Sequence, residues 1–194
     1  IMGLILGSLY FASIAKVIST KPIPSSAKNY AWFAGQSILL SVCWLALFVL
    51  ISLPASMLLG VMAIISPAFA TVGVMLIGVI LIWILVPLMF SPHGIFMYHQ
   101  NALFSMLNSL RLVRFILPSA GLFFLTLIIL SQGLDLIWQV PPSSSWMTVV
   151  GMAGHAFVTT ALLAASFVYY RDGMQWVQEI VNRSLASKEK LSKI

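Results

Sequence analysis

The fold is decided by the stretch NYAWFAGQSILLSVCWLALFVLISLPASMLLGVMAIISPAFATVGVMLIGVILIWILVPLMFSPHGIFMYHQNALFSMLNSL, which runs from Asn29 to Leu110 and contains no Lys, Arg, Asp or Glu. A water-facing surface needs charged side chains, which make up roughly a quarter of an ordinary soluble domain. In this chain of 194 residues only 7% are charged and 61% are hydrophobic. The stretch is therefore predicted to be dissolved in lipid rather than in water.

Working outward from this stretch, the chain contains five apolar segments that can be read as membrane spans, each needing about 20 residues. They are Met2–Ile18, Trp32–Leu53, Ala68–Phe90, Phe115–Leu130 and Trp146–Tyr170. Pro54 is expected to end the second span, because proline interrupts the helical hydrogen bonds. That leaves Ala55–Ser66 as a short apolar segment that lies in the outer interface or re-enters the membrane from that side. The predicted fold class is an all-α polytopic transmembrane helix bundle.

Three further segments have a different composition. Ser91–Arg114 is predicted to be an amphipathic helix, lying on the membrane or packed under the bundle. Its polar and apolar residues recur at helical spacing and would form opposite faces. The polar face has Asn101, Ser105, Asn108 and Arg111, and the apolar face has Phe96, Leu103, Leu107 and Leu110. Gln132–Ser145 is predicted to be a polar connection, and 171–194 a basic tail helix. We therefore expect a transmembrane domain over 1–170 and a cytoplasmic tail over 171–194.

The ten basic residues, which give a formal net charge of +6, lie at segment ends. In a nucleic-acid-binding protein, basic residues cluster on one folded face, so nucleic acid is not an expected partner. With five spans, all ten fall on one side, as the positive-inside rule requires of the cytoplasmic face. We expect a multi-pass protein of the inner (cytoplasmic) membrane with a cytoplasmic C-terminus. The visible amino end then lies outside, which predicts a preceding helix and six spans in the full chain.

Arg111, Arg114 and Arg171 are the candidate contacts for lipid phosphates or for the acidic groups of a partner. The alternative is that they only fix the topology. Lipid is an expected partner in either case, and other membrane subunits are expected beside it.

His155 is the one ionisable group expected deep within a span. Gly151, four residues earlier, lies on the same helix face and leaves a shallow space beside the imidazole. A flat macrocycle could use that space, with His155 as its single axial ligand to the iron of haem or the magnesium of a chlorophyll. The alternative is a helix-packing position that hydrogen-bonds a neighbouring helix. No cofactor is required by the sequence.

The sequence gives little support to ion-coupled transport, metal binding or catalysis. Asp135 is expected in an outer loop, so the spans would hold no carboxylate, which counts against an ion-coupled transporter. His93 and His99 lack accompanying ligands at metal-binding spacing, so no metal site is predicted. Ser52 is the one serine level with His155, and no strained glycine-serine turn surrounds it. No catalytic residues are predicted, and the protein is not expected to be an enzyme.

A pattern in the second half of the chain carries a family resemblance. It consists of Asn101-Ala102-Leu103, Ser105, Ser109-Leu110-Arg111-Leu112-Val113-Arg114 and, after a helix pair, Tyr169-Tyr170-Arg171-Asp172. The pattern resembles the bacterial uncharacterised six-helix inner-membrane proteins related to the membrane domain of glycerophosphoryl diester phosphodiesterases. The similarity covers roughly Pro87 to Trp176. It implies six helices and no catalytic residues, since the phosphodiesterase domain is absent.

Together these observations favour a non-catalytic accessory, scaffolding or assembly subunit of a larger membrane complex. Helix faces lined with Gly and Ala suit packing against lipid and other helices better than lining an aqueous path. One alternative is a transporter or permease component for a hydrophobic or lipid-like substrate. A second alternative is a pigment- or haem-binding subunit that uses His155.

Overall fold

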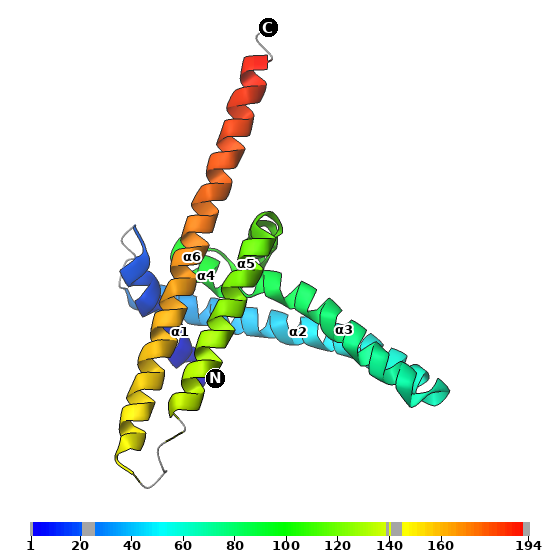
Figure 1. The fold of residues 1–194 in the computed structure, drawn as a ribbon. Coiled ribbons are helices and arrows are strands. Elements are labelled where there is room, and N and C mark those ends of the chain that lie inside the picture. The colour runs from blue at the N-terminus through cyan, green and yellow to red at the C-terminus, as the bar shows by residue number, and fades with distance from the viewer. Residues whose placement is uncertain (1, 21–25, 139, 141–144, 192–194) are drawn as a thin grey trace. The chain divides into compact units, whose positions relative to one another are not determined.

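The computed structural model describes residues 2–20, 26–138, 140 and 145–191, with side chains as far as Leu185. Over these residues the chain forms six α-helices and no strand (Figure 1). The helices are α1 (Met2–Ile18), α2 (Ala27–Ile65), α3 (Pro67–Leu88), α4 (Ser91–Tyr98), α5 (Ala102–Trp138) and α6 (Met147–Leu191). By length and composition, four candidate spans can cross a membrane: the helices α2, α5 and α6 and the run from α3 through α4; α1 is a shorter apolar helix. The all-α, multi-pass prediction is confirmed.

The chain forms two compact units, Ile1–Arg111 and Leu112–Ile194, and α5 contributes to both. The predicted boundary between a membrane domain over 1–170 and a tail over 171–194 stays a prediction. Helix α6 runs without interruption through Tyr170 and Arg171, so the basic tail is a continuation of the last apolar helix.

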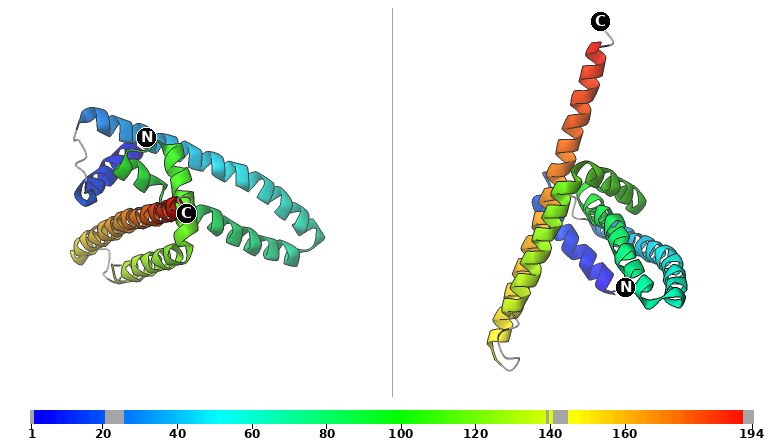
Figure 2. Two further views of the ribbon diagram at one scale, coloured as in Figure 1. Left: turned by 90° about the horizontal axis from the view of Figure 1, so that it is seen from above. Right: turned by 45° about the vertical axis from the view of Figure 1, so that its right-hand side comes forward.

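In the first unit, α2 and α3 form a long helical hairpin (Figures 1 and 2). Ser66 ends α2 and caps α3, because its hydroxyl accepts a hydrogen bond from the Ala68 amide at 3.3 Å. Pro67 then occupies the first turn of α3, where its missing N–H leaves no intrahelical bond unmade. A Cβ at Gly73 would lie 2.8 Å from the Met62 sulfur, so this glycine lets the two helices pack closely.

The prediction that Pro54 ends the second span is wrong, because α2 continues through it to Ile65. Proline removes one backbone hydrogen bond, whereas ending a helix in lipid would leave many backbone groups unpaired. Ala55–Ile65 is therefore the second half of α2 and not a separate interfacial segment. At 1.5 Å per residue, the 39 residues of α2 extend about 58 Å.

The prediction of one helix over Ser91–Arg114 is also wrong, because α4 and α5 are separated after Tyr98. His99 has a left-handed backbone (φ 54°), and its ring stacks on Trp32 with centroids 3.7 Å apart. The Ala102 amide donates to the Gln36 side-chain oxygen at 2.8 Å. Contacts from α2 thus stabilise the end of one helix and the start of the next.

The first turns of α5 bury small hydroxyls and expose large apolar side chains. Ser105 donates to the Ser91 carbonyl oxygen at 2.5 Å, and Ser109 donates to the Pro87 carbonyl oxygen. Both serines are fully buried, whereas Leu103 and Leu107 are more than half exposed. We call Ser91, Ser105 and Ser109 the serine seam. Of the predicted polar positions, Ser105 is therefore buried against protein, whereas Asn101 and Arg111 are exposed. Leu103 and Leu107 face outward, as suits a lipid solvent.

In the second unit, α5 and α6 run side by side and meet through large side chains (Figure 1). Phe123 and Tyr169 stack with centroids 4.2 Å apart, and the Tyr169 hydroxyl lies 2.7 Å from the Ser119 hydroxyl. The backbone of α5 is non-helical at Ile116, two residues before Pro118, so the helix is kinked there.

Candidate functional site

His155 on α6 pairs with Asp135 on α5, with His155 Nδ1 2.6 Å from Asp135 Oδ1. The prediction that Asp135 lies in a loop is wrong, because α5 continues as far as Trp138. The argument that the spans hold no carboxylate therefore no longer counts against ion coupling. The His155 side chain is 53% exposed and that of Asp135 29% exposed, so the pair lies at the surface of the second unit.

The space predicted beside His155 is occupied by Trp138. A Cβ at Gly154 would lie 2.5 Å from Cη2 of the Trp138 indole, and one at Gly151 would lie 3.2 Å from the Trp138 carbonyl oxygen. The Trp138 Nε1 atom is buried and has no hydrogen-bond partner within the described part of the chain. A macrocycle using this glycine face would have to displace Trp138. Ring binding at His155 stays a prediction that no observation favours.

The other two histidines contact aromatic rings. His93 meets Phe90 edge-on at 5.3 Å, and His99 stacks on Trp32. No three His, Cys, Asp or Glu side chains among the described residues come together as metal ligands. The Ser52 hydroxyl donates to the Val49 carbonyl oxygen at 3.3 Å, within its own helix.

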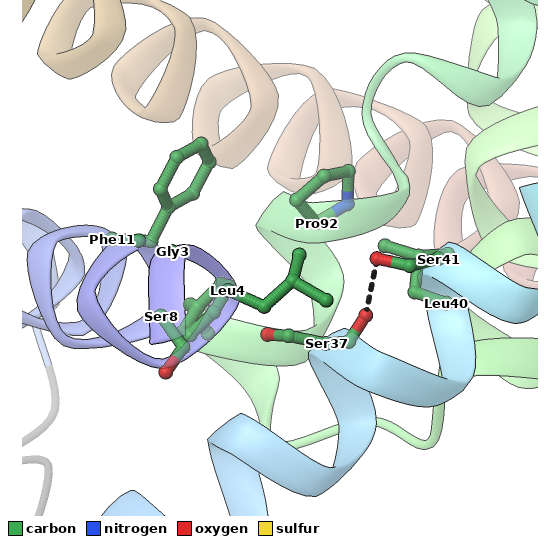
Figure 3. A pocket seen from close by; sticks show the side chains of 10 residues that line it. Gly3, Leu4, Ser8, Phe11, Ser37, Leu40, Ser41 and Pro92 are labelled. Carbon is green, nitrogen blue, oxygen red and sulfur yellow. Dashed lines mark hydrogen bonds between the residues drawn. The ribbon is translucent and has the colours of Figure 1, made fainter. Parts of the chain in front are cut away.

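A cavity in the first unit was not predicted from the sequence. It has a volume of about 190 Å³ and is lined by α1, α2 and α4. In Figure 3, Leu4 reaches from α1 toward Ser37 on α2, and Pro92 lies beside them on α4. A sequence signal for it is the pairing of small residues: Gly3, Gly7 and Ser8 on one face of α1, and Ser37 and Ser41 one turn apart on α2.

Two of the serines at this cavity donate within their own helices. Ser8 donates to the Ile5 carbonyl oxygen at 2.7 Å, and Ser41 to the Ser37 carbonyl oxygen at 2.9 Å. These bonds satisfy the hydroxyls locally, as is usual for serine in helices. With Leu4, Leu40 and other apolar walls, the cavity is suited to a hydrocarbon chain.

The three arginines predicted as lipid or partner contacts are distributed over the two units. Arg111 is in the first unit, and Arg114 and Arg171 are in the second. Arg111 and Arg114 are exposed. Arg171 donates from Nε to Asp172 Oδ1 at 2.8 Å and is 26% exposed. Their role as contacts stays a prediction.

Comparison with models of known protein families, with curated proteins and with solved structures finds no match for this chain. The resemblance to phosphodiesterase membrane domains therefore stays a prediction as well.

Proposed function

We propose that this protein is a non-catalytic membrane protein that acts as an accessory, scaffolding or assembly subunit of a larger complex. Its location would be the cytoplasmic membrane of a bacterium, with the C-terminus in the cytoplasm. Lipid and the helices of other subunits would cover its apolar faces.

The observation that carries this proposal is the α2–α3 hairpin. Only 6% of the most apolar part of α2, and 11% of that of the α3–α4 run, is buried within the protein. Exposed hairpin side chains include Ile64 at 87% and Met75 at 70%. Small residues between them let a further helix approach, because a Cβ at Gly60 or Gly78 would meet nothing within 4 Å.

Site-specific photo-crosslinking in native membranes tests this role. Benzoylphenylalanine replaces Ile64 or Met75 on the hairpin, and Thr20, which is exposed and polar, serves as the control position. We expect the same discrete protein adduct from both hairpin positions and not from position 20. Lipid adducts alone at both hairpin positions, together with a monomeric mass in nanodiscs, would contradict the proposal.

A second candidate function rests on the cavity between α1, α2 and α4. An apolar cavity that reaches the protein surface fits a permease component for a lipid-like substrate. Gly7→Leu would fill this cavity, and Gly78→Leu is the matched control, since both glycines have open space beside them. If this function is correct, proteoliposomes should move a fluorescent lipid, and only Gly7→Leu should stop the transfer.

A further inference from the structure

A second cavity, of about 570 Å³, lies between α5 and α6 in the second unit. This volume is within the range of sites that bind small molecules. From α5 it is lined by residues around the kink, including Phe115 and Ser119. From α6 it is lined by one helix face with spacings of three, four and seven: Tyr169, Asp172, Gly173 and Trp176. The cavity therefore lies beside the kink at Ile116.

The walls of this cavity combine three aromatic rings with a carboxylate. Phe115 is 60% exposed and Trp176 is 49% exposed, so their rings are open to a ligand. Tyr169 is fixed by its stack on Phe123 and its contact with Ser119. Aromatic faces attract cations through the ring quadrupole, most strongly for tryptophan, and such rings recognise alkylammonium groups. The Asp172 carboxylate adds a negative charge to the same wall.

The position of the cavity along both helices places it at the edge of the apolar region. On α5, Arg114 is the last charged residue before the apolar segment that begins at Phe115. On α6, Arg171 and Asp172 are the first Lys, Arg, Asp or Glu residues after the apolar segment that ends at Tyr170. Tryptophan and tyrosine are enriched at this depth, where the headgroups of lipids lie. Arg171 also brings a positive charge next to Asp172.

We propose that this cavity binds the alkylammonium group of a zwitterionic phosphodiester or phosphomonoester, with its phosphate beside Arg171. The ammonium group lies against Phe115, Tyr169 and Trp176, with Asp172 as its counter-charge. The source is a phospholipid headgroup or a free amino-alcohol phosphate. This site does not depend on the proposed accessory function, because it needs only the second unit's own residues.

Titration of the purified full-length chain in detergent tests the site. The probes are phosphocholine, phosphoethanolamine and, as an anion without an ammonium group, glycerol phosphate. A short-chain phosphatidylcholine and the matching phosphatidylglycerol supply the lipid arm. We expect the ammonium compounds to bind, and Trp176→Leu or Asp172→Asn to weaken binding by about tenfold.

Matched controls separate the site from general effects of the substitutions. Trp146→Leu removes an exposed tryptophan outside this cavity, and Glu179→Gln removes an exposed carboxylate two turns farther along α6. Trp176→Phe keeps an aromatic ring and should retain most of the affinity. This conservative variant guards against a loss caused only by misfolding of Trp176→Leu.

The soluble compounds and the short-chain lipids distinguish the two possible sources of the ligand. Binding of phosphocholine alone supports a soluble ligand, and binding of the short-chain lipid alone supports a headgroup. Equal binding of the choline and glycerol compounds would overturn the proposal. So would the absence of any binding, or unchanged affinity in both Trp176→Leu and Asp172→Asn.

Discussion

Gly154 has no room for a side chain, because the Trp138 indole lies across it. His155 and Gly151 could be selected from their spacing, but their neighbours on α5 could not. The segment that contains Gln132, Gly133 and Asp135 has the composition of a loop. In the structure it is helical, and Asp135 contacts His155, a residue 20 positions away that no local pattern reveals as its partner.

Gly154→Ala is expected to destabilise the second unit by about 1–3 kcal/mol, because the new Cβ would overlap three indole atoms at 2.5–2.8 Å. Thermal unfolding in detergent measures the change. Gly121→Ala is the control, since a Cβ there meets nothing within 4 Å. If the indole is the cause, adding Trp138→Leu should recover most of the loss. A double variant as unstable as Gly154→Ala alone would rule that cause out.

The Asp135–His155 pair is expected to contribute up to about 1 kcal/mol, since both side chains are partly exposed. A double-mutant cycle with Asp135→Asn and His155→Gln measures the coupling in the free energy of unfolding. Additive effects of the two substitutions would show that the pair does not stabilise the fold. The same His155→Gln protein tests pigment binding: a visible absorption band unchanged from the native protein would exclude His155 as its ligand.

At the scale of elements, composition predicts the helices well and their ends poorly. Pro54 breaks helices in water, but in lipid the unpaired backbone groups of a helix end are worse than one missing hydrogen bond. The break near His99 depends on a ring stack with Trp32 and a backbone bond to Gln36, which come from α2. Helix boundaries that are set by another helix cannot be found from the local sequence.

The serine seam is expected to stabilise the packing of the start of α5 against α3 and α4. Ser105→Ala and Ser109→Ala should each destabilise the fold by roughly 0.5–1.5 kcal/mol, because each removes one buried hydrogen bond. Ser109→Leu should be worse, because the site is fully buried and has no space for the larger side chain.

Ser13→Ala is the control for these variants, since Ser13 is exposed and bonds only within its own helix. Unfolding in detergent, monitored by circular dichroism, measures all four proteins. Equal stability of Ser13→Ala and Ser105→Ala would show that the seam does not stabilise the fold.

At the scale of the whole molecule, the excess of apolar residues was enough to predict a multi-pass helical protein. The division into units at Arg111 and Leu112 was not predictable, because it falls within the continuous helix α5. The composition changes close by, where the apolar segment begins at Phe115, but that change does not show which helices each part of α5 packs against. The partition depends on which side chains meet in space, as the serine seam and the Phe123–Tyr169 stack show.

The proposed topology makes a definite prediction about four positions. Single cysteines are placed at Thr20, Ser66, Ser145 and Ser184 in a Cys43→Ser background. An impermeant maleimide should label positions 66 and 145 in intact cells, and positions 20 and 184 only after permeabilisation. Labelling of 20 and 66 from the same side would contradict the alternating arrangement.

The length of α2 constrains the membrane itself. From Ala31 to Ile65 it contains no charged residue and is mostly apolar, whereas the hydrocarbon core of a bilayer is about 30 Å thick. A helix about 58 Å long cannot stand upright with all of that surface in hydrocarbon. A tilt of α2, a bend in it, extension of its ends into the interface or a locally thicker bilayer would each accommodate this length, and each has a free energy that changes with acyl-chain length. Hydrophobic mismatch therefore couples the arrangement of α2 to the thickness of the bilayer that surrounds it.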